Sequence, residues 1–165
     1  MNISFKDFIK ISEGKQVGTL YHFTRLSSLQ SFLTNGWDLG SHMDYFSFTR
    51  NPDMLNQKYK NDFTLDWKIG DKRVVRIVID GDKLSNNFKI EPYLDVTHNI
   101  KREQGEYEEI INKSQKLKSI DIEKYIKQID IKIEKEYFDK LLKQLPKTKI
   151  KINQVNPKNN FKKVK

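Results

Sequence analysis

The sequence predicts a single domain of the α+β class, for three reasons. Short runs rich in β-branched and aromatic residues are separated by a few helical patterns, and strand and helix do not alternate regularly. A length of 165 residues corresponds to one domain. The hydrophobic share of 36% and the aromatic share of 12% are sufficient to build a core.

The elements expected in the first half are short and end at recognisable signals. They are a helix capped by Ser4, a strand over 19–23, a helix capped by Ser27 and ended at Asn35 and Gly36, a strand over 45–49, and a turn or helix start at 51–53. Gly36 is expected to stop the second helix, because glycine readily adopts the left-handed conformation found at helix ends.

The second half is expected to carry the clearest strand pattern and the last helix. The expected elements are a hairpin of strands 63–69 and 72–79 turning at Gly70 and Asp71, a short helix after a turn at 80–84, an extended piece at 88–91, a loop at 95–105, strands at 107–111 and 126–133, and a helix over 134–145. Alternation in the last strand predicts that Asp130 and Lys132 lie on an exposed face. The last helix is expected to bury Tyr137, Phe138, Leu141 and Leu142.

The composition excludes several classes of protein. The absence of cysteine rules out a disulfide scaffold, a thiolate metal site and a cysteine nucleophile, and with three histidines we expect no dedicated histidine-based metal site. No run approaches the ~18 apolar residues of a membrane span. Residues 1–15 lack the apolar region of a secretory signal, so we expect a soluble, cytoplasmic protein.

The net charge of +9 is concentrated at the C-terminal end of the chain. Residues 140–165 hold nine lysines and no Asp or Glu, whereas residues 1–139 are formally neutral. We therefore expect a domain over 1–145 and a basic, extended or disordered tail over 146–165. Such a tail suits an electrostatic arm for nucleic acid or another acidic partner, although a merely solvated tail has the same composition.

Three polar segments at strand ends are candidates for chemistry. His22 and Thr24 share one face of a strand and can bind a sugar hydroxyl or an amide, although a lone histidine is often structural. In the strand over 46–49, small hydroxyl residues alternate with aromatic residues that also suit an ordinary core strand. Glu106 and Glu108 share a face, so that one carboxylate can have a raised pKa for acid–base work, although acidic clusters are usually solvated.

The order of these segments resembles the ADP-ribosyltransferase superfamily, and small phage-encoded members in particular. The likeness extends more loosely to the DNA-targeting toxins of that superfamily. It covers residues 17–133, and the segments that carry it are YHFT (21–24), SFTRN (47–51), RIVIDGDKL (76–84), EYEEII (106–111) and YIKQIDI (125–131).

The resemblance implies a split, two-sheet β core with short flanking helices and with NAD, as the substrate, in the cleft between the sheets. It implies that the NAD-binding residues come from two strand motifs: His22, Phe23 and Thr24 from the first, and Phe46, Ser47, Phe48 and Thr49 from the second. His22 and Thr24 would hold the ribose and amide on the nicotinamide side, and Ser47 would line the nicotinamide pocket with Phe46 or Phe48. Arg50 would pair with the NAD diphosphate or with a phosphate of the target.

The resemblance also implies a late glutamate that stabilises positive charge on the ribose carbon. Glu108 is the first choice, since it shares a face with Glu106, and Glu109 is the alternative. Ser47 stands where many members with a histidine in the first motif have Tyr.

The function that follows is transfer of ADP-ribose from NAD to a macromolecular acceptor, either nucleic acid or protein, in the host cytoplasm if a phage encodes the chain. One alternative is a degenerate member of the fold that binds nucleic acid or a nucleotide, as a phage accessory protein. A second is a small nuclease that holds a metal with Asp95, Glu106 and Glu108. The oligomeric state is left open.

Overall fold

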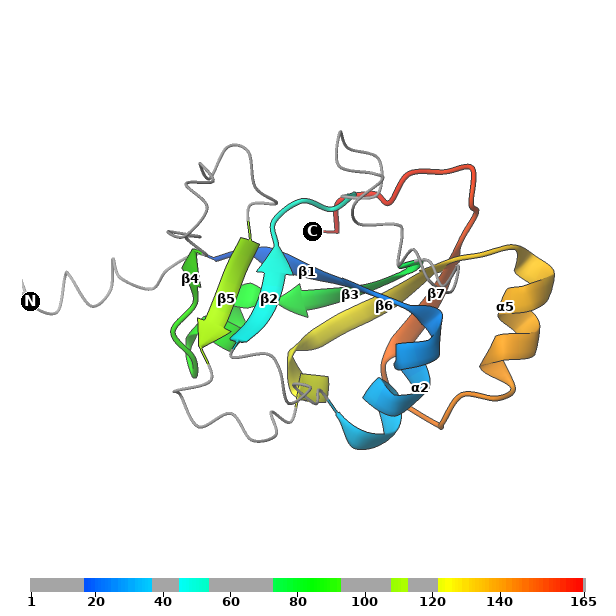
Figure 1. Ribbon diagram of the computed structural model, residues 1–165, viewed down its shortest axis with the longest axis horizontal. Helices are drawn as coiled ribbons and strands as arrows, with labels where there is room; N and C mark the ends of the chain where they lie inside the picture. The colour runs from blue at the N-terminus through cyan, green and yellow to red at the C-terminus, as the bar shows by residue number, and fades with distance from the viewer. Residues whose placement is uncertain (1–16, 37–44, 54–72, 93–107, 113–121, 165) are drawn as a thin grey trace, which may run out of the picture.

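A computed structural model describes residues 17–36, 45–53, 73–92, 108–112 and 122–164. Within these ranges seven strands form one sheet in the order β4-β5-β2-β1-β3-β6-β7 (Figure 1). The strands are β1 Thr19–Thr24, β2 Tyr45–Thr49, β3 Val75–Asp80, β4 Glu91–Pro92, β5 Glu108–Asn112, β6 Ile126–Lys132 and β7 Lys151–Val155. The helices are α2 Leu26–Asn35, α4 Gly81–Ser85 and α5 Lys135–Leu142, with a 3₁₀ turn, η3, at Ile122–Tyr125. The predicted α+β class is confirmed.

The sheet has a narrow junction between β1 and β2. All neighbouring strands are antiparallel except β6 and β7, which are parallel. β1 pairs with β3 along its whole length, from Thr19↔Asp80 to Thr24↔Val75. In contrast, the described pairing of β1 with β2 consists of Tyr21↔Thr49 alone. The described strands thus form one connected sheet and not two separate ones, but β4-β5-β2 crosses β1-β3 steeply at this junction (Figure 1).

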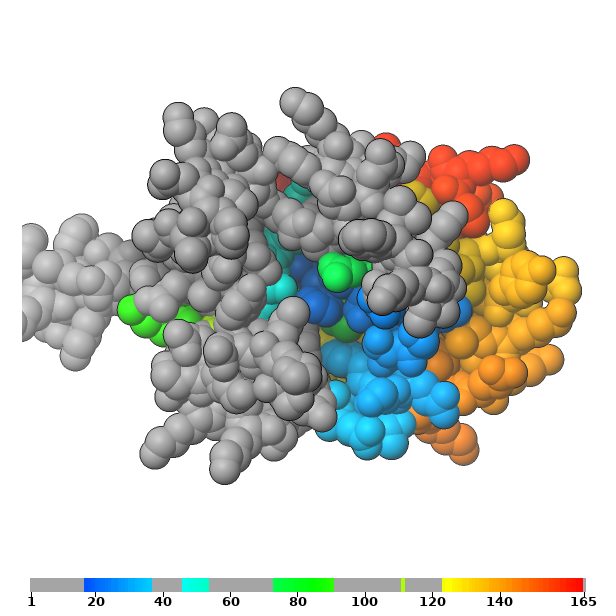
Figure 2. All heavy atoms as spheres, viewed as in Figure 1, coloured from blue at the N-terminus to red at the C-terminus, as the bar shows by residue number. Residues whose placement is uncertain are grey.

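One face of the sheet carries the main hydrophobic core. Alternate residues of β1, β3 and β6 are fully buried there, among them Leu20, Ile77 and Ile129. Three helices contribute to this core, with Leu29 of α2, Leu84 of α4 and Phe138 of α5 inserted into it. In the space-filling view, α2 lies near the middle of the surface and α5 at its edge (Figure 2). Burial of these apolar side chains is what fixes the helices on the sheet.

Two helix predictions differ from the structure in detail. α2 ends at Gly36 with a φ of 75°, as predicted, but it begins after Arg25, and no side chain caps its first turn. Ser27 is therefore inside the helix and is not its cap. α5 is shorter than expected, and of its predicted apolar face Tyr137 is 64% and Leu142 is 40% exposed.

The opposite face of the sheet is covered by the C-terminal segment. Residues 151–155 form β7, and Phe161 packs edge-on against Phe23 with ring centroids 5.8 Å apart. Phe161 is only 3% exposed, and the amide of Val164 donates a hydrogen bond to the Tyr21 hydroxyl at 3.2 Å. The segment from 146 to 164 contains β7 and a turn at 157–158, and it belongs to the same sheet and core as the residues before it.

Several predictions lie outside the described residues. They are the helix capped by Ser4, the strand over 63–69 with its turn at Gly70 and Asp71, the loop over 95–105 and the carboxylate of Glu106. In the part of the chain that is described, no helix is long and apolar enough to cross a membrane.

Candidate functional site

Three segments that are distant in sequence lie on adjacent strands. His22 is in β1, Ser47 and Thr49 are in β2, and Glu108 and Glu109 are in β5, and the sheet order places β2 between the other two. The chain leaves β2 for β3 and β4 before it returns to β5, so this neighbourhood depends on long-range pairing. The narrow junction between β1 and β2 lies within it.

His22 makes the clearest polar contact of the candidate site. Its Nδ1 lies 3.0 Å from the backbone carbonyl oxygen of Ser47. A carbonyl can only accept, so Nδ1 carries the proton, and in the neutral ring Nε2 carries the acceptor lone pair. This contact joins the two strands beside their single register pair, and it fixes both the tautomer and the orientation of the imidazole.

The pKa of His22 is lowered from 6.5 to about 4. Burial of the half-buried ring is the main cause, since it disfavours the charged form. The hydrogen bond to Ser47 opposes this effect, and the charge of Arg73 adds to it. His22 is therefore neutral at physiological pH, so it suits hydrogen bonding to a neutral sugar better than pairing with an anion.

The lowered pKa predicts a loss of stability in mild acid. The unfolded chain takes up a proton at His22 near pH 6.5 and the folded protein does so only near pH 4, so the free energy of unfolding falls as the pH drops between these values. The loss from this group is expected to be about 2 kcal/mol between about pH 7 and about pH 5. Urea denaturation over this range measures it.

The matched variant is His22→Asn, whose amide can donate to the Ser47 carbonyl but does not titrate. Its free energy of unfolding is expected to change less with pH than that of the wild type. If the free energy of unfolding depends equally on pH in both proteins, the pKa of His22 is not lowered in the folded state.

The aromatic residues predicted to bind NAD belong to the cores on the two faces of the sheet. Phe46 and Phe48 are 1% and 2% exposed and lie in the main core, and Phe23 packs with Phe161 on the opposite face. The alternative interpretation of these aromatics as core residues of an ordinary strand therefore describes their packing. They support the site strands and do not form an open surface.

The polar residues of the two motifs differ in burial. Thr24 and Ser47 are half-buried, whereas Thr49 is buried and its hydroxyl accepts a hydrogen bond from the amide of Asn51 at 3.0 Å. Asn51 in turn accepts from the amide of Asp53, which forms the turn predicted at 51–53. Arg50 is exposed where the chain leaves β2.

The strand register separates the two candidate glutamates. Glu108 lies opposite Thr49, which is itself opposite Tyr21, and Glu109 lies opposite Phe48. Residues in register share a face of an antiparallel pair, and neighbours along a strand alternate. The position of Glu109 is therefore on the face of Phe48 and His22, and the position of Glu108 is on the other face.

A buried ion pair next to this region was not predicted. Asp130, expected on an exposed face, is 2% exposed, because its carboxylate accepts hydrogen bonds from Nε and Nη2 of Arg76 at 3.1 and 2.6 Å. Gln128 and Asn153 also donate to Asp130. The sequence feature that indicates this ion pair is an arginine inside the apolar run VVRIVI, because a buried charge is stable only when it is paired.

Arg76 also holds two chain segments in place. Its Nη1 donates to the carbonyl of Pro52 at 2.7 Å and to that of Lys162 at 2.9 Å. The guanidinium lies 4.5 Å from the ring centroid of Phe161 and 5.1 Å from that of Tyr21. The exit of β2 and the C-terminal segment are thus fixed by one side chain.

Comparisons with known proteins find no family model that matches this chain, no similar curated protein and no similar solved structure. Among the described residues, no group of three His, Asp or Glu side chains is arranged to hold a metal ion. Asp95 and Glu106, two of the three carboxylates considered for a nuclease, lie outside those residues.

Proposed function

We propose that the protein is a mono-ADP-ribosyltransferase, which transfers ADP-ribose from NAD to a macromolecule. The observation that supports this best is the adjacency of β1, β2 and β5, the strands that carry the histidine, hydroxyl and glutamate motifs of the resemblance. The narrow junction between β1 and β2 adds support, because the two halves of a split β core would be separated at a junction of this kind.

In this reaction the bond between nicotinamide and the ribose carbon breaks, and nicotinamide leaves with the bonding electrons. Positive charge then develops on the ribose, and a fixed carboxylate stabilises it more in the transition state than in the ground state. The acceptor's nucleophilic atom forms the new bond to the ribose carbon and loses its proton. We assign the stabilising role to a glutamate of β5.

His22 has the chemistry that binding of the ribose requires. A neutral imidazole with its proton on Nδ1 can accept a hydrogen bond from a sugar hydroxyl through Nε2. An imidazolium at the same place would repel the developing positive charge. The lowered pKa of His22 therefore favours catalysis of this kind at neutral pH.

The register favours Glu109 over Glu108 as the partner of His22. Glu109 occupies a position on the same face as His22, whereas Glu108 occupies a position on the face of Tyr21 and Thr49. We therefore propose Glu109, the alternative that the sequence left open, as the stabilising carboxylate.

The direct test is incubation of the purified protein with NAD labelled in the adenylate part, with and without a cell lysate. The expected results are release of nicotinamide and label in macromolecules, and treatment with nuclease or protease then identifies the class of acceptor. Neither release nor transfer would contradict the proposal and favour the alternative, a catalytically inactive module that binds nucleic acid or a nucleotide.

A further inference from the structure

The C-terminal lysines lie on a defined surface of the protein. Lys147, Lys149, Lys151, Lys158, Lys162 and Lys163, called here the C-terminal lysine surface, are all exposed. The segment that carries them is anchored by β7, by the buried Phe161 and by the bonds of Arg76 and Tyr21 to its backbone. The backbone that carries these lysines is thus held in place and does not need to be ordered when a partner binds, which lowers the entropic cost of association.

The charge of this surface has no local compensation in sequence. No Asp or Glu occurs after Asp139. Lys135 and Lys140 of α5, in contrast, pair with Asp139 and Glu136 on the same helix. A strongly positive surface on an otherwise neutral chain attracts a polyanion, and the attraction is long-ranged at low salt.

The lysines are distributed along an extended element. Lys147 and Lys149 precede β7, Lys151 begins it, and Lys158 follows it. A strand of five residues spans about 17 Å, so these charges suit an elongated ligand better than one small phosphate. β7 is the last strand of the described sheet, so its outer edge has no neighbouring strand among the described residues.

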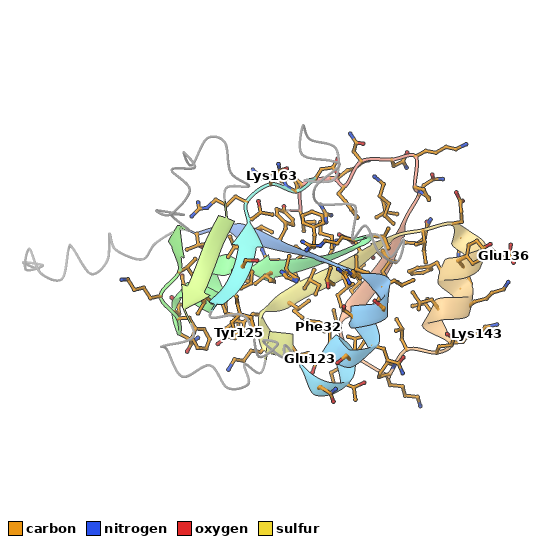
Figure 3. The ribbon with its side chains drawn as sticks, in the orientation of Figure 1. Phe32, Glu123, Tyr125, Glu136, Lys143 and Lys163 are labelled. Carbon is orange, nitrogen blue, oxygen red and sulfur yellow. The ribbon has the colours of Figure 1, made fainter. Side chains whose placement is uncertain are left out.

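One end of the surface lies beside the exit of β2, on the face of the sheet that carries Tyr21 and Thr49, opposite to the positions of His22 and Glu109. The carbonyls of Lys162 and Pro52 accept hydrogen bonds from the same nitrogen of Arg76, which places Lys162 beside the chain that leaves β2. Lys163 lies at the same end of the molecule as this exit (Figure 3). Arg50 is exposed there as well. A ligand held along the lysines would therefore lead to the strand that carries Ser47.

From this placement we infer that the C-terminal lysine surface binds the phosphate backbone of a nucleic acid. Binding needs no catalytic activity, so it is tested independently of the proposed function. Contacts to phosphates are independent of base sequence, so we expect little sequence preference and a strong dependence on salt.

The test measures binding of the full chain to a short fluorescent single-stranded oligonucleotide by anisotropy, from about 50 mM to about 200 mM salt. The variant is Lys162→Gln with Lys163→Gln, which keeps the buried Phe161 and the backbone contact to Arg76. We expect affinity at low salt to fall by about tenfold or more, and the slope of log affinity against log salt to decrease in magnitude by about 1.4, or about 0.7 for each lysine on a single strand.

The matched control is Lys135→Gln with Lys140→Gln, which removes the same charge from exposed lysines of α5. Its salt slope is expected to equal that of the wild type. No binding by the wild type at low salt, or an equal loss in both variants, would overturn the inference, and an acidic protein would then be the better partner.

Discussion

Arg76→Ala is expected to lower the free energy of unfolding by about 3 to 5 kcal/mol, which is a large part of the stability of a domain of this size. The substitution leaves Asp130, at 2% exposure, as a buried carboxylate without its cationic partner. It also removes the donor for the carbonyls of Pro52 and Lys162. Urea denaturation at neutral pH measures the loss.

A double variant distinguishes an unpaired buried charge from a simple loss of contacts. In Arg76→Met with Asp130→Asn neither charge remains, and the amide oxygen can still accept from Gln128 and Asn153. We expect this protein to be more stable than Arg76→Ala, because the main penalty is the uncompensated charge. If the double variant is no more stable, the role of Arg76 is to hold Pro52 and Lys162.

The surface pair on α5 provides a matched control for the buried one. Lys135→Ala removes one partner of an exposed ion pair with Asp139. Exposed pairs at this spacing contribute about half a kcal/mol or less, so the free energy of unfolding should hardly change. A loss comparable to that of Arg76→Ala would mean that burial does not govern these interactions.

The strands could be predicted from sequence because the hydrophobicity of consecutive residues determines the burial pattern of a strand. β2 has the predicted bounds, β6 ends one residue before the predicted end, and β5 is shifted by one residue from the predicted range 107–111. Which strands are neighbours could not be predicted in this way. β5 lies beside β2 and β7 beside β6 through contacts between residues distant in the chain, for which the local pattern holds no information.

The residues that were misjudged are those whose partners are distant in sequence. Asp130 alternates with isoleucines as a solvent-facing residue would, but Arg76, 54 positions earlier, makes its burial favourable. Phe161 stands among lysines and asparagines that are typical of a tail. It is buried because Tyr21, Phe23 and Val78 form a second apolar cluster on the far face of the sheet.

The candidate site could be predicted only in part for the same reason. The motifs indicated which strands carry polar residues, and the structure brings those strands together. The contact of His22 with the carbonyl of Ser47 is a backbone interaction, which the identity of residue 47 does not reveal. The register of β5 was likewise open: the sequence favoured Glu108, because it shares a face with Glu106, and only the pairing with β2 places Glu109 on the face of His22.

Glu109→Gln is expected to reduce nicotinamide release from NAD by at least about a hundredfold, since an electrostatic group aimed at developing charge contributes about that much or more. Glutamine keeps the size and hydrogen-bonding capacity of the side chain but not its negative charge. If the glutamate acts on the transition state, kcat should fall while the KM for NAD changes little. Initial rates over a range of NAD concentrations separate the two effects.

Glu108→Gln is the matched comparison, because it makes the same chemical change one residue earlier in β5. The register places Glu109, and not Glu108, on the face of His22, so the rate of Glu108→Gln should stay close to that of the wild type. A loss of nicotinamide release in Glu108→Gln alone would instead mean that the reaction takes place on the face of Tyr21 and Thr49. Full activity in both variants would show that no carboxylate of β5 stabilises the ribose cation. The assignment as a transferase would then be wrong, because it depends on that stabilising charge.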